Sequence, residues 1–329
     1  MGDICVNHEW GRLKEVVVGY PYVKYPKISP PLVHNFVSKA GISRYQKYAG
    51  KTLEAADPEL YRQQVQQIDA VIKILQDHDV IVHQLKPFTA EEEQYLANLD
   101  DFTTQFFPRG AMIVIGDTFI EPALKLIGRR KERFPIRRTI GDRLKNSNAR
   151  VIPMPVASPI PYGQEGWDET PFLEGGDVFV LGHDIYVGCS GNASNDAGID
   201  WLQATLGSDY QVHKIPITKH FLHLDFVLSI LRPGLAVVCR EGFVNGLPAF
   251  LKDWRLIDQS FEDAQSKLSC NHLVLDEETV IVASELPDLA QALRKAGQKV
   301  ITTPMSAIYW QGGSLRCWHH PLVRESNLE

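Results

Sequence analysis

A hairpin followed by a helix and a returning strand recurs along this chain, and the recurrence limits the possible folds more than any other feature. The clearest copy covers 178–215: two apolar runs joined by Gly182-His183-Asp184, a helix expected over 197–206, and a strand over 210–215. Short glycine-containing turns between apolar runs are typical of β-hairpins. One such unit cannot bury its apolar face alone, so it needs neighbours of the same kind.

Further stretches follow the same order. The first begins at 13–19 and continues with a helix over 58–76 and a strand over 79–85. The second begins at 111–121 and continues with a helical basic segment to about 146 and a strand over 150–154. The others are 226–239, and 272–282 with a helix over 287–296 and a strand over 299–302. We therefore expect one closed, pseudo-symmetric α/β domain spanning 1–329. The Pro-rich run 153–161 is interpreted as a loop, because repeats continue on both sides, and as a candidate site wall. Residues 21–57 show no sustained period and are interpreted as a long excursion that either covers a site or is simply irregular.

Composition excludes several classes of protein. The chain is 44% hydrophobic and 22% charged, which is a globular composition with enough apolar material for a core. Its net charge of -6 gives no overall attraction to nucleic acid or to an anionic membrane. The basic run 129–133, with Arg137 and Arg138, is interpreted as a solvated helix face. No stretch approaches the roughly 18 apolar residues that would suggest a membrane span.

The five cysteines are odd in number and widely dispersed, which predicts reduced thiols. Because the N-terminal stretch also lacks a charged-then-apolar signal segment, we expect a cytoplasmic protein. There is no CxxC pair and no HExxH run, so neither a metal nor another cofactor is expected. The sequence leaves the oligomeric state open, a homo-oligomer included.

Three motifs carry candidate chemistry: Glu174-Gly175-Gly176-Asp177, His223-Leu224-Asp225, and Cys317 after the pair Gly312-Gly313. The first two stand at the starts of equivalent strands in the repeat, and equivalent strand starts converge on the central axis. Taken alone, the first motif is better explained by a tight turn with solvated carboxylates, and the second by a histidine satisfied within the core. The cysteine follows the last repeat, where closure of the fold brings it to the same axis.

A thiol, an imidazole and several carboxylates around one point suit a cationic substrate. Carboxylates placed so close repel one another, and a cation relieves that repulsion. A planar guanidinium matches paired carboxylates in shape. Its carbon is a poor electrophile, so the reaction needs a strong nucleophile and a proton donor for the departing amine. Cysteine supplies the first and histidine the second.

Together with the ending Gly312-Gly313-Ser314-Leu315-Arg316-Cys317, these motifs resemble the guanidino-group-modifying superfamily, the pentein fold. The opening 7–19 and the stretches 116–121, 198–202, 210–213 and 231–234 resemble amidinotransferases. The resemblance covers nearly the whole chain. It implies a five-fold pseudo-symmetric α/β propeller built from hairpin-helix-strand repeats.

The resemblance also implies roles for single residues. Cys317 would be the nucleophile that forms a covalent thiouronium intermediate, and His223 the general acid and then the general base. Asp177 and Asp225 would hold the guanidinium, with Asp177 counted among the catalytic residues. Glu174 would be a partner of His223 and a further substrate-binding candidate.

The remaining substrate-binding candidates are Gly313 of the glycine pair, Arg109, Arg240 and Asn245. The two residues after the fourth hairpin, Arg240 and Asn245, suit a substrate carboxylate and equally suit a surface role. Arg109 is a candidate carboxylate clamp. Most relatives have an acidic residue after this arginine, where the present chain has Gly110, and that departure leaves the amino-acid end of the substrate undefined.

The expected function is transfer of the amidino group of arginine, or of a similar guanidino donor, to an amine acceptor. The alternative is a guanidine hydrolase of the arginine deiminase, dihydrolase or dimethylarginine hydrolase type, which uses water as the acceptor. The motif at 174–177 and the ending 316–322 look more like the hydrolases, and the N-terminus looks more like the transferases. An inactive pentein that acts by binding alone would be expected to have lost Cys317 or His223, and both are present.

Overall fold

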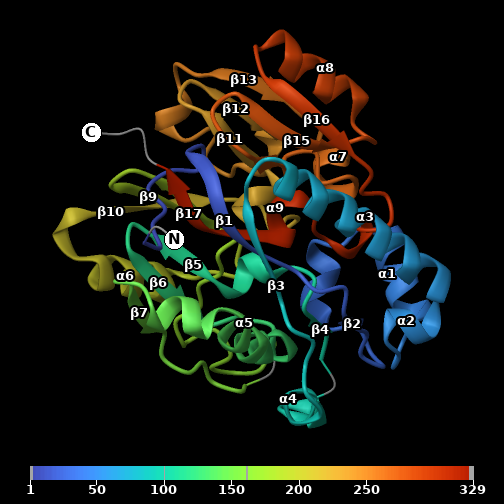
Figure 1. Cartoon of the computed structure of the whole chain (residues 1–329). Helices are drawn as coiled ribbons and strands as arrows, with labels where there is room; N and C mark the ends of the chain where they lie inside the picture. The colour runs from blue at the N-terminus through green and yellow to red at the C-terminus, as the bar shows by residue number, and fades with distance from the viewer. Residues whose placement is uncertain (1–2, 100, 161, 326–329) are drawn as a thin grey trace.

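Five three-stranded sheets surround a common axis in the computed structural model, which describes residues 3–99, 101–160 and 162–325 (Figure 1). In each sheet the middle strand pairs antiparallel with one neighbour and parallel with the other. The strands, sheet by sheet, are β17 (His319–Glu325), β1 (Arg12–Val18) and β3 (Ile81–Gln84); β5 (Ile113–Ile115), β6 (Thr118–Glu121) and β7 (Arg150–Pro153); β8 (Val178–Leu181), β9 (Asp184–Cys189) and β10 (Gln211–Pro216); β11 (Leu228–Arg232), β12 (Leu235–Val238) and β13 (Arg255–Asp258); β14 (Leu273–Val274), β15 (Thr279–Ala283) and β16 (Lys299–Thr303). This repetition confirms the predicted pentein-type propeller.

The first sheet is closed by the last strand of the chain. β17 pairs antiparallel with β1, from Arg12 opposite Glu325 to Val18 opposite His319, and the two strands lie side by side in the centre of Figure 1. The sequence analysis assigned no strand to this stretch. A strand that completes a sheet more than 300 residues away leaves no local hairpin signal, because its partner is distant in the sequence.

Most helices lie around the sheets, at the periphery of Figure 1, whereas α9 (Leu315–Trp318) lies near its centre. The long helix predicted over 58–76 is confirmed: the Asp57 carboxylate accepts from Leu60 N at 3.1 Å and Pro58 occupies the first turn. The alternative that 21–57 is simply irregular is wrong, since two short helices form there with Ser38 and Thr52 as N-caps. The helices are α1 (Lys39–Lys47), α2 (Leu53–Ala56), α3 (Pro58–Asp77), α4 (Ala90–Gln94), α5 (Arg133–Lys145), α6 (Asp196–Leu206), α7 (Phe261–Ser266), α8 (Pro287–Lys295) and α9 (Leu315–Trp318). A two-stranded sheet of β2 (Val23–Lys24) and β4 (Thr103–Thr104) lies beside them.

The basic run before α5 is buried, and its interpretation as a solvated face is wrong for 129–132. These residues form the 3-10 helix η4 (Ile127–Glu132), and Arg129 is 5% exposed. Arg130 donates to the carbonyl oxygens of Leu124 (2.9 Å) and Ser158 (2.8 Å). Hydrogen bonds to backbone carbonyls and to buried carboxylates compensate these cations for the loss of water.

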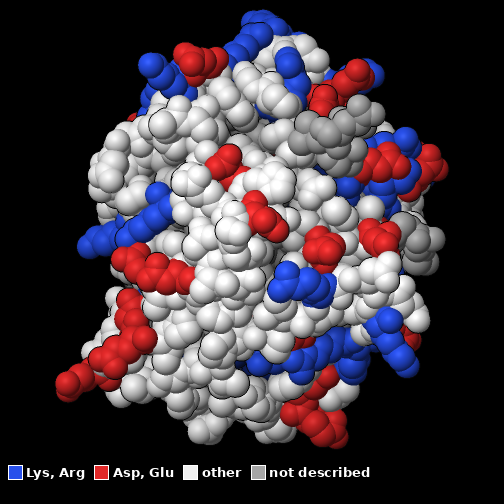
Figure 2. Space-filling view, turned by 90° about the vertical axis from the view of Figure 1, so that its left-hand side faces the viewer, with Lys and Arg blue, Asp and Glu red and all other residues white. Residues whose placement is uncertain are grey.

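On the face shown in Figure 2, side chains of both charges are interspersed among uncharged residues. Among the residues that the structure describes, no helix is long and apolar enough to cross a membrane.

Candidate active site

Cys317 lies in α9, immediately before β17, and is buried. Its backbone N–H donates to Asn271 Oδ1 at 3.1 Å, and Asn271 Nδ2 lies 3.2 Å from the sulfur. Asp225 Oδ2 lies 3.5 Å from the sulfur on another side. Burial, followed by the negative charge of Asp225, raises the pKa of the Cys317 thiol. Both effects favour the protonated thiol over the thiolate.

The two carboxylate oxygens of Asp225 differ: Oδ2 accepts a hydrogen bond, and Oδ1 has no donor within the described residues. Arg316 Nη1 donates to its Oδ2 at 3.1 Å, while Arg316 Nη2 donates to Glu9 Oε2, also at 3.1 Å. Oδ1 is buried and has no hydrogen-bond partner within 3–99, 101–160 and 162–325. A buried carboxylate oxygen left without a donor is costly. Oδ1 is therefore available to accept an N–H group from a ligand in the cavity.

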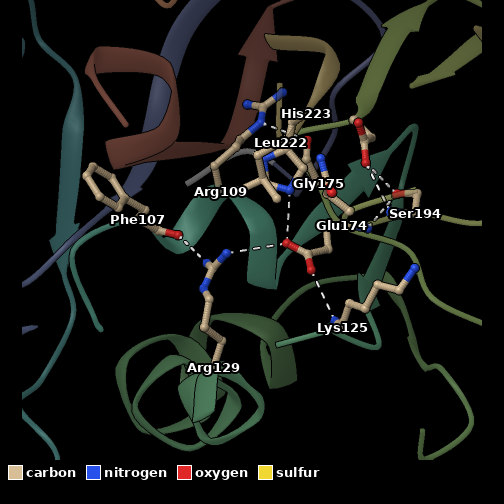
Figure 3. Close-up of polar contacts among 12 residues, drawn as sticks. Phe107, Arg109, Lys125, Arg129, Glu174, Gly175, Ser194, Leu222 and His223 are labelled. Atoms are coloured by element: carbon tan, nitrogen blue, oxygen red, sulfur yellow. Dashed lines mark hydrogen bonds and ion pairs between the residues drawn. The ribbon is translucent and has the colours of Figure 1, made fainter. Parts of the chain in front are cut away.

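His223 is held by Glu174, as Figure 3 shows. Its Nε2 lies 2.9 Å from Glu174 Oε2, and Glu174 Oε1 accepts from Lys125 N at 3.1 Å. Burial alone would lower the pKa of His223, but the nearby carboxylates of Asp177, Glu174 and Asp225 outweigh it and raise the pKa. The surroundings of His223 therefore favour the protonated, cationic form of its imidazole.

Gly176 allows this imidazole to approach the backbone. A Cβ added at this position would lie 2.4 Å from His223 Nδ1, closer than any real contact. Gly175 is equally confined, because a Cβ there would lie 2.1 Å from Met112 O. The two glycines of the motif at 174–177 are therefore required by packing against the site.

Asp177 lies beside the site, but its oxygens are already used. Its Oδ2 accepts from Ser194 Oγ (2.6 Å) and its Oδ1 from Leu224 N (3.0 Å). Burial raises the pKa of Asp177 to about 6. Its carboxylate supports the backbone around His223 and does not line the cavity, which differs from the arrangement expected for a group that holds a guanidinium.

The other predicted residues divide into two groups. Arg109 is buried in the cavity wall, where its Nε donates to Gly175 O at 3.2 Å and its Nη2 lies 3.5 Å from Glu9 Oε1. Gly313 packs under the cavity, since a Cβ there would lie 2.5 Å from the Phe107 ring. Arg240 and Asn245 are exposed and outside this cavity, and Arg240 pairs with Asp258 at 2.5 Å. Arg240 and Asn245 therefore lie away from the cavity that contains the Cys317 thiol.

The cavity that joins Cys317, His223 and Asp225 has mostly apolar walls. Aromatic and aliphatic side chains from distant parts of the chain cover it, which lowers the local dielectric constant and strengthens every charge interaction inside. These side chains are Val33, Phe36, Tyr45, Phe102, Phe107 and Leu126.

Three residues of the site were missed by the sequence analysis. Asn271 contacts the thiol, Arg316 holds Asp225, and Arg129 lies 3.3 Å from Glu174. Asn271 directly precedes the fifth hairpin, so the same strand-start argument that selected Asp225 would have found it. Arg316 and Arg129 carry no such positional signal, because the site carboxylates that they contact, Asp225 and Glu174, lie 91 and 45 residues away in the sequence.

The arrangement brings a thiol, an imidazole paired with a carboxylate, and a carboxylate oxygen without a donor to one mostly apolar cavity. A positive charge placed at Asp225 Oδ1 lies next to Cys317, and a nearby cation favours the thiolate form of a cysteine. The described residues contain no group of three or more His, Cys, Asp or Glu side chains arranged to hold a metal ion.

Comparison with known proteins agrees with this chemistry. The chain is 24% identical to the mitochondrial glycine amidinotransferase of Gallus gallus over 360 residues, covering 99% of this chain and 84% of that protein. The structure of SxtG, an amidinotransferase of the saxitoxin biosynthetic pathway from Microseira wollei, superposes with a TM-score of 0.82 at 24% identity and covers 99% of both chains. DDAH from Pseudomonas aeruginosa superposes with a TM-score of 0.64 at 17% identity, covering 94% of this chain and 99% of that one.

A family model gives the assignment. Residues 34–324 match the model described as N,N dimethylarginine dimethylhydrolase, eukaryotic, which is most of the chain. Together with the five-sheet fold, this match assigns the protein: the chain belongs to the N,N-dimethylarginine dimethylhydrolase family, within the guanidino-modifying pentein superfamily.

Proposed function

We propose that this protein is an amidinotransferase that moves the amidino group of arginine, or of a similar guanidino donor, to an amine through a covalent intermediate on Cys317. Full-length similarity to proteins named as amidinotransferases supports transfer. The geometry of the cavity supports the cysteine route.

The open oxygen of Asp225 is the observation that carries this proposal. Asp225 Oδ1 is buried and lacks a partner within the described part of the chain, while Oδ2 of the same carboxylate lies 3.5 Å from the Cys317 sulfur. A guanidinium N–H that donates to Oδ1 places the guanidinium beside the thiol. A planar cation with several N–H donors suits this position better than an ammonium ion.

In the first half-reaction the cysteine displaces an amine. Binding of the donor cation favours loss of the thiol proton to solvent, and the thiolate attacks the guanidino carbon. A C–S bond forms. The C–N bond to the departing amine then breaks as His223 transfers a proton to that nitrogen. The amidino group remains on sulfur as a thiouronium cation beside Asp225.

In the second half-reaction the acceptor amine attacks the same carbon. His223, now neutral, takes the proton that the amine loses, and the C–S bond breaks to give the new guanidino compound and a Cys317 thiolate, which regains its proton from solvent. Glu174 keeps His223 oriented in both steps through the 2.9 Å contact at Nε2. We propose that this orienting role belongs to Glu174, with Asp177 supporting the backbone.

Hydrolysis is the second candidate, favoured by the match to the dimethylarginine dimethylhydrolase model. In that reaction water replaces the amine acceptor after the same first half-reaction. An inactive binding protein is a poorer match, because the thiol, the imidazole and an open carboxylate oxygen meet in one cavity.

Product analysis separates these possibilities. We expect incubation with arginine and a set of candidate amines to yield ornithine and a new guanidino compound, identified by mass. Citrulline would indicate a deiminase, and ornithine with urea would indicate amidino hydrolysis. No turnover of arginine and no mass adduct on Cys317 would contradict the arginine assignment.

Gly176→Ala is expected to lower kcat/KM about 100-fold, because the added Cβ would lie 2.4 Å from His223 Nδ1 and would displace the imidazole. Gly141→Ala is the matched control: it lies in α5 with nothing within 4 Å of the added Cβ, and it should leave activity unchanged. Steady-state kinetics compare the two variants. Equal activity in both would show that the tight packing against His223 has no catalytic importance.

A further inference from the structure

Arg129 enters the active site although the proposed reaction does not use it. It projects from η4 toward Glu174 and is buried (Figure 3). Glu132 accepts from its Nε (2.7 Å) and Nη2 (3.0 Å), and Phe107 O accepts from Nη2 at 2.9 Å. These contacts fix the plane of the guanidinium and leave Nη1 directed toward Glu174, at 3.3 Å.

One oxygen of Glu174 serves two cationic partners. Oε2 lies 3.3 Å from Arg129 Nη1 and 2.9 Å from His223 Nε2. The guanidinium and the imidazole therefore compete for the same lone pairs, and a protonated His223 also faces the positive charge of Arg129. Both effects favour the neutral form of the imidazole relative to a site that lacks the arginine.

Gly110 is what allows this approach. A Cβ at position 110 would lie 3.1 Å from both Nη1 and Nη2 of Arg129, and 3.3 Å from Glu174 Oε2. Any side chain at this position has to push against the guanidinium or against the carboxylate that it shares with His223. The position of the Arg129 guanidinium therefore depends on the absence of a side chain at Gly110, the position at which this sequence departs from the family pattern.

We propose that Arg129 is a positioning residue that, through the shared oxygen of Glu174, sets the pH at which His223 gives up its proton, and that Gly110 keeps it in that place. The inference rests on the proposed function, in which His223 must be protonated to release the first amine. Arg129 lowers the pKa of His223. The imidazolium can then give up its proton to the departing amine, and the neutral imidazole can accept a proton from the incoming amine.

The other charges around His223 are accounted for. Asp177, Glu174 and Asp225 all favour its protonated form, and burial opposes it. Arg109 lines the same cavity and pairs with Glu9, while Arg316 pairs with Asp225. Arg129 is the cation that contacts the carboxylate bound to the imidazole, so its removal has the most direct effect.

The test is the pH dependence of arginine turnover in Arg129→Gln, Arg129→Lys and Gly110→Ala. In Arg129→Gln the His223 imidazolium no longer shares Glu174 Oε2 with a guanidinium and no longer faces its positive charge. The pKa of His223 should therefore rise, and the fall of kcat at alkaline pH should shift to higher pH by about one unit. Gly110→Ala displaces the guanidinium and should move the limb in the same direction. Arg129→Lys keeps the charge and should move it least. Arg150→Gln, which removes an exposed arginine, should not move it.

Titration of His223 by NMR in 13C-histidine-labelled protein, assigned by loss of its signal in His223→Gln, gives an independent readout. An unchanged titration of His223 in both Arg129→Gln and Gly110→Ala would overturn the proposal, even if kcat falls, because a purely structural role predicts that result. Mass analysis of the Cys317 adduct in the wild-type protein tests the proposed function separately. Absence of that adduct would overturn the proposed function, while the NMR titration would still decide the role of Arg129.

Discussion

Cys317→Ser should reduce turnover of the guanidino donor by about four to six orders of magnitude while leaving the fold intact. Loss of the nucleophile in other cysteine- or serine-dependent enzymes has effects of this size. A serine hydroxyl fills nearly the same space and keeps the contacts to Asn271. Its proton is far harder to remove, even with a cation bound at Asp225. Kinetics together with mass analysis should show that both turnover and the covalent adduct are lost.

Cys5→Ser is the matched control for this experiment. Cys5 is half-buried at the edge of the fold, where its backbone N–H donates to Leu322 O at 3.0 Å, and it does not line the catalytic cavity. Full activity and a normal adduct on Cys317 are expected. Retention of turnover in Cys317→Ser would mean that the reaction does not pass through Cys317, and loss of turnover in Cys5→Ser would mean that the effect of replacing a cysteine is not specific to Cys317.

Asp225→Asn should lower kcat/KM for the guanidino donor at least about 100-fold. The substitution keeps the shape of the side chain but removes the charge that accepts the guanidinium at Oδ1, and charge-assisted hydrogen bonds contribute about 1.5–3 kcal/mol. It also leaves Arg316 without one of its two carboxylates. Breaking a buried pair costs about 3–5 kcal/mol, so a lower Tm is expected as well. Kinetics and thermal unfolding measure the two effects.

Asp177→Asn separates the loss of stability from the loss of substrate binding. Asp177 is also fully buried and accepts from Ser194 and Leu224, so its replacement should lower Tm to a comparable degree. Because it presents no oxygen to the cavity, KM for the donor should change much less than in Asp225→Asn. A larger rise in KM for Asp177→Asn than for Asp225→Asn would mean that Asp177 binds the guanidinium, as the sequence analysis expected.

Much of the fold could be predicted because its repeating unit is local. The hairpin turns at Gly116, Gly182 and Gly234 all adopt positive φ, and each joins strands that are adjacent in the sequence. The cap at Asp57 also acts within three residues. By contrast, β17 pairs with β1 across nearly the whole chain, and the short helices near the N-terminus bury few of their own residues.

The candidate site was predictable to the extent that repeat symmetry applies. His223 and Asp225 precede an equivalent strand in the repeat, and the structure brings both to Cys317. The same symmetry could not tell which carboxylate of the motif at 174–177 would face the histidine. That choice depends on the contacts of Ser194 and Leu224 with Asp177, which leave Glu174 to bind His223.

The sequence by itself indicated the class of chemistry, because a thiol, an imidazole and carboxylates at repeated strand starts suit a guanidinium, and because these motifs resemble the guanidino-group-modifying superfamily. Only the tertiary structure decided how the charges are paired. Arg129 appeared in the sequence as part of a basic run typical of a solvated surface, yet it is buried against Glu174 and Glu132. Burial and ion pairing depend on residues distant in the chain, whereas periodicity, capping and turn formation depend on neighbours. The space at Gly110 that admits this arginine is likewise a property of packing, which the linear order of residues does not contain.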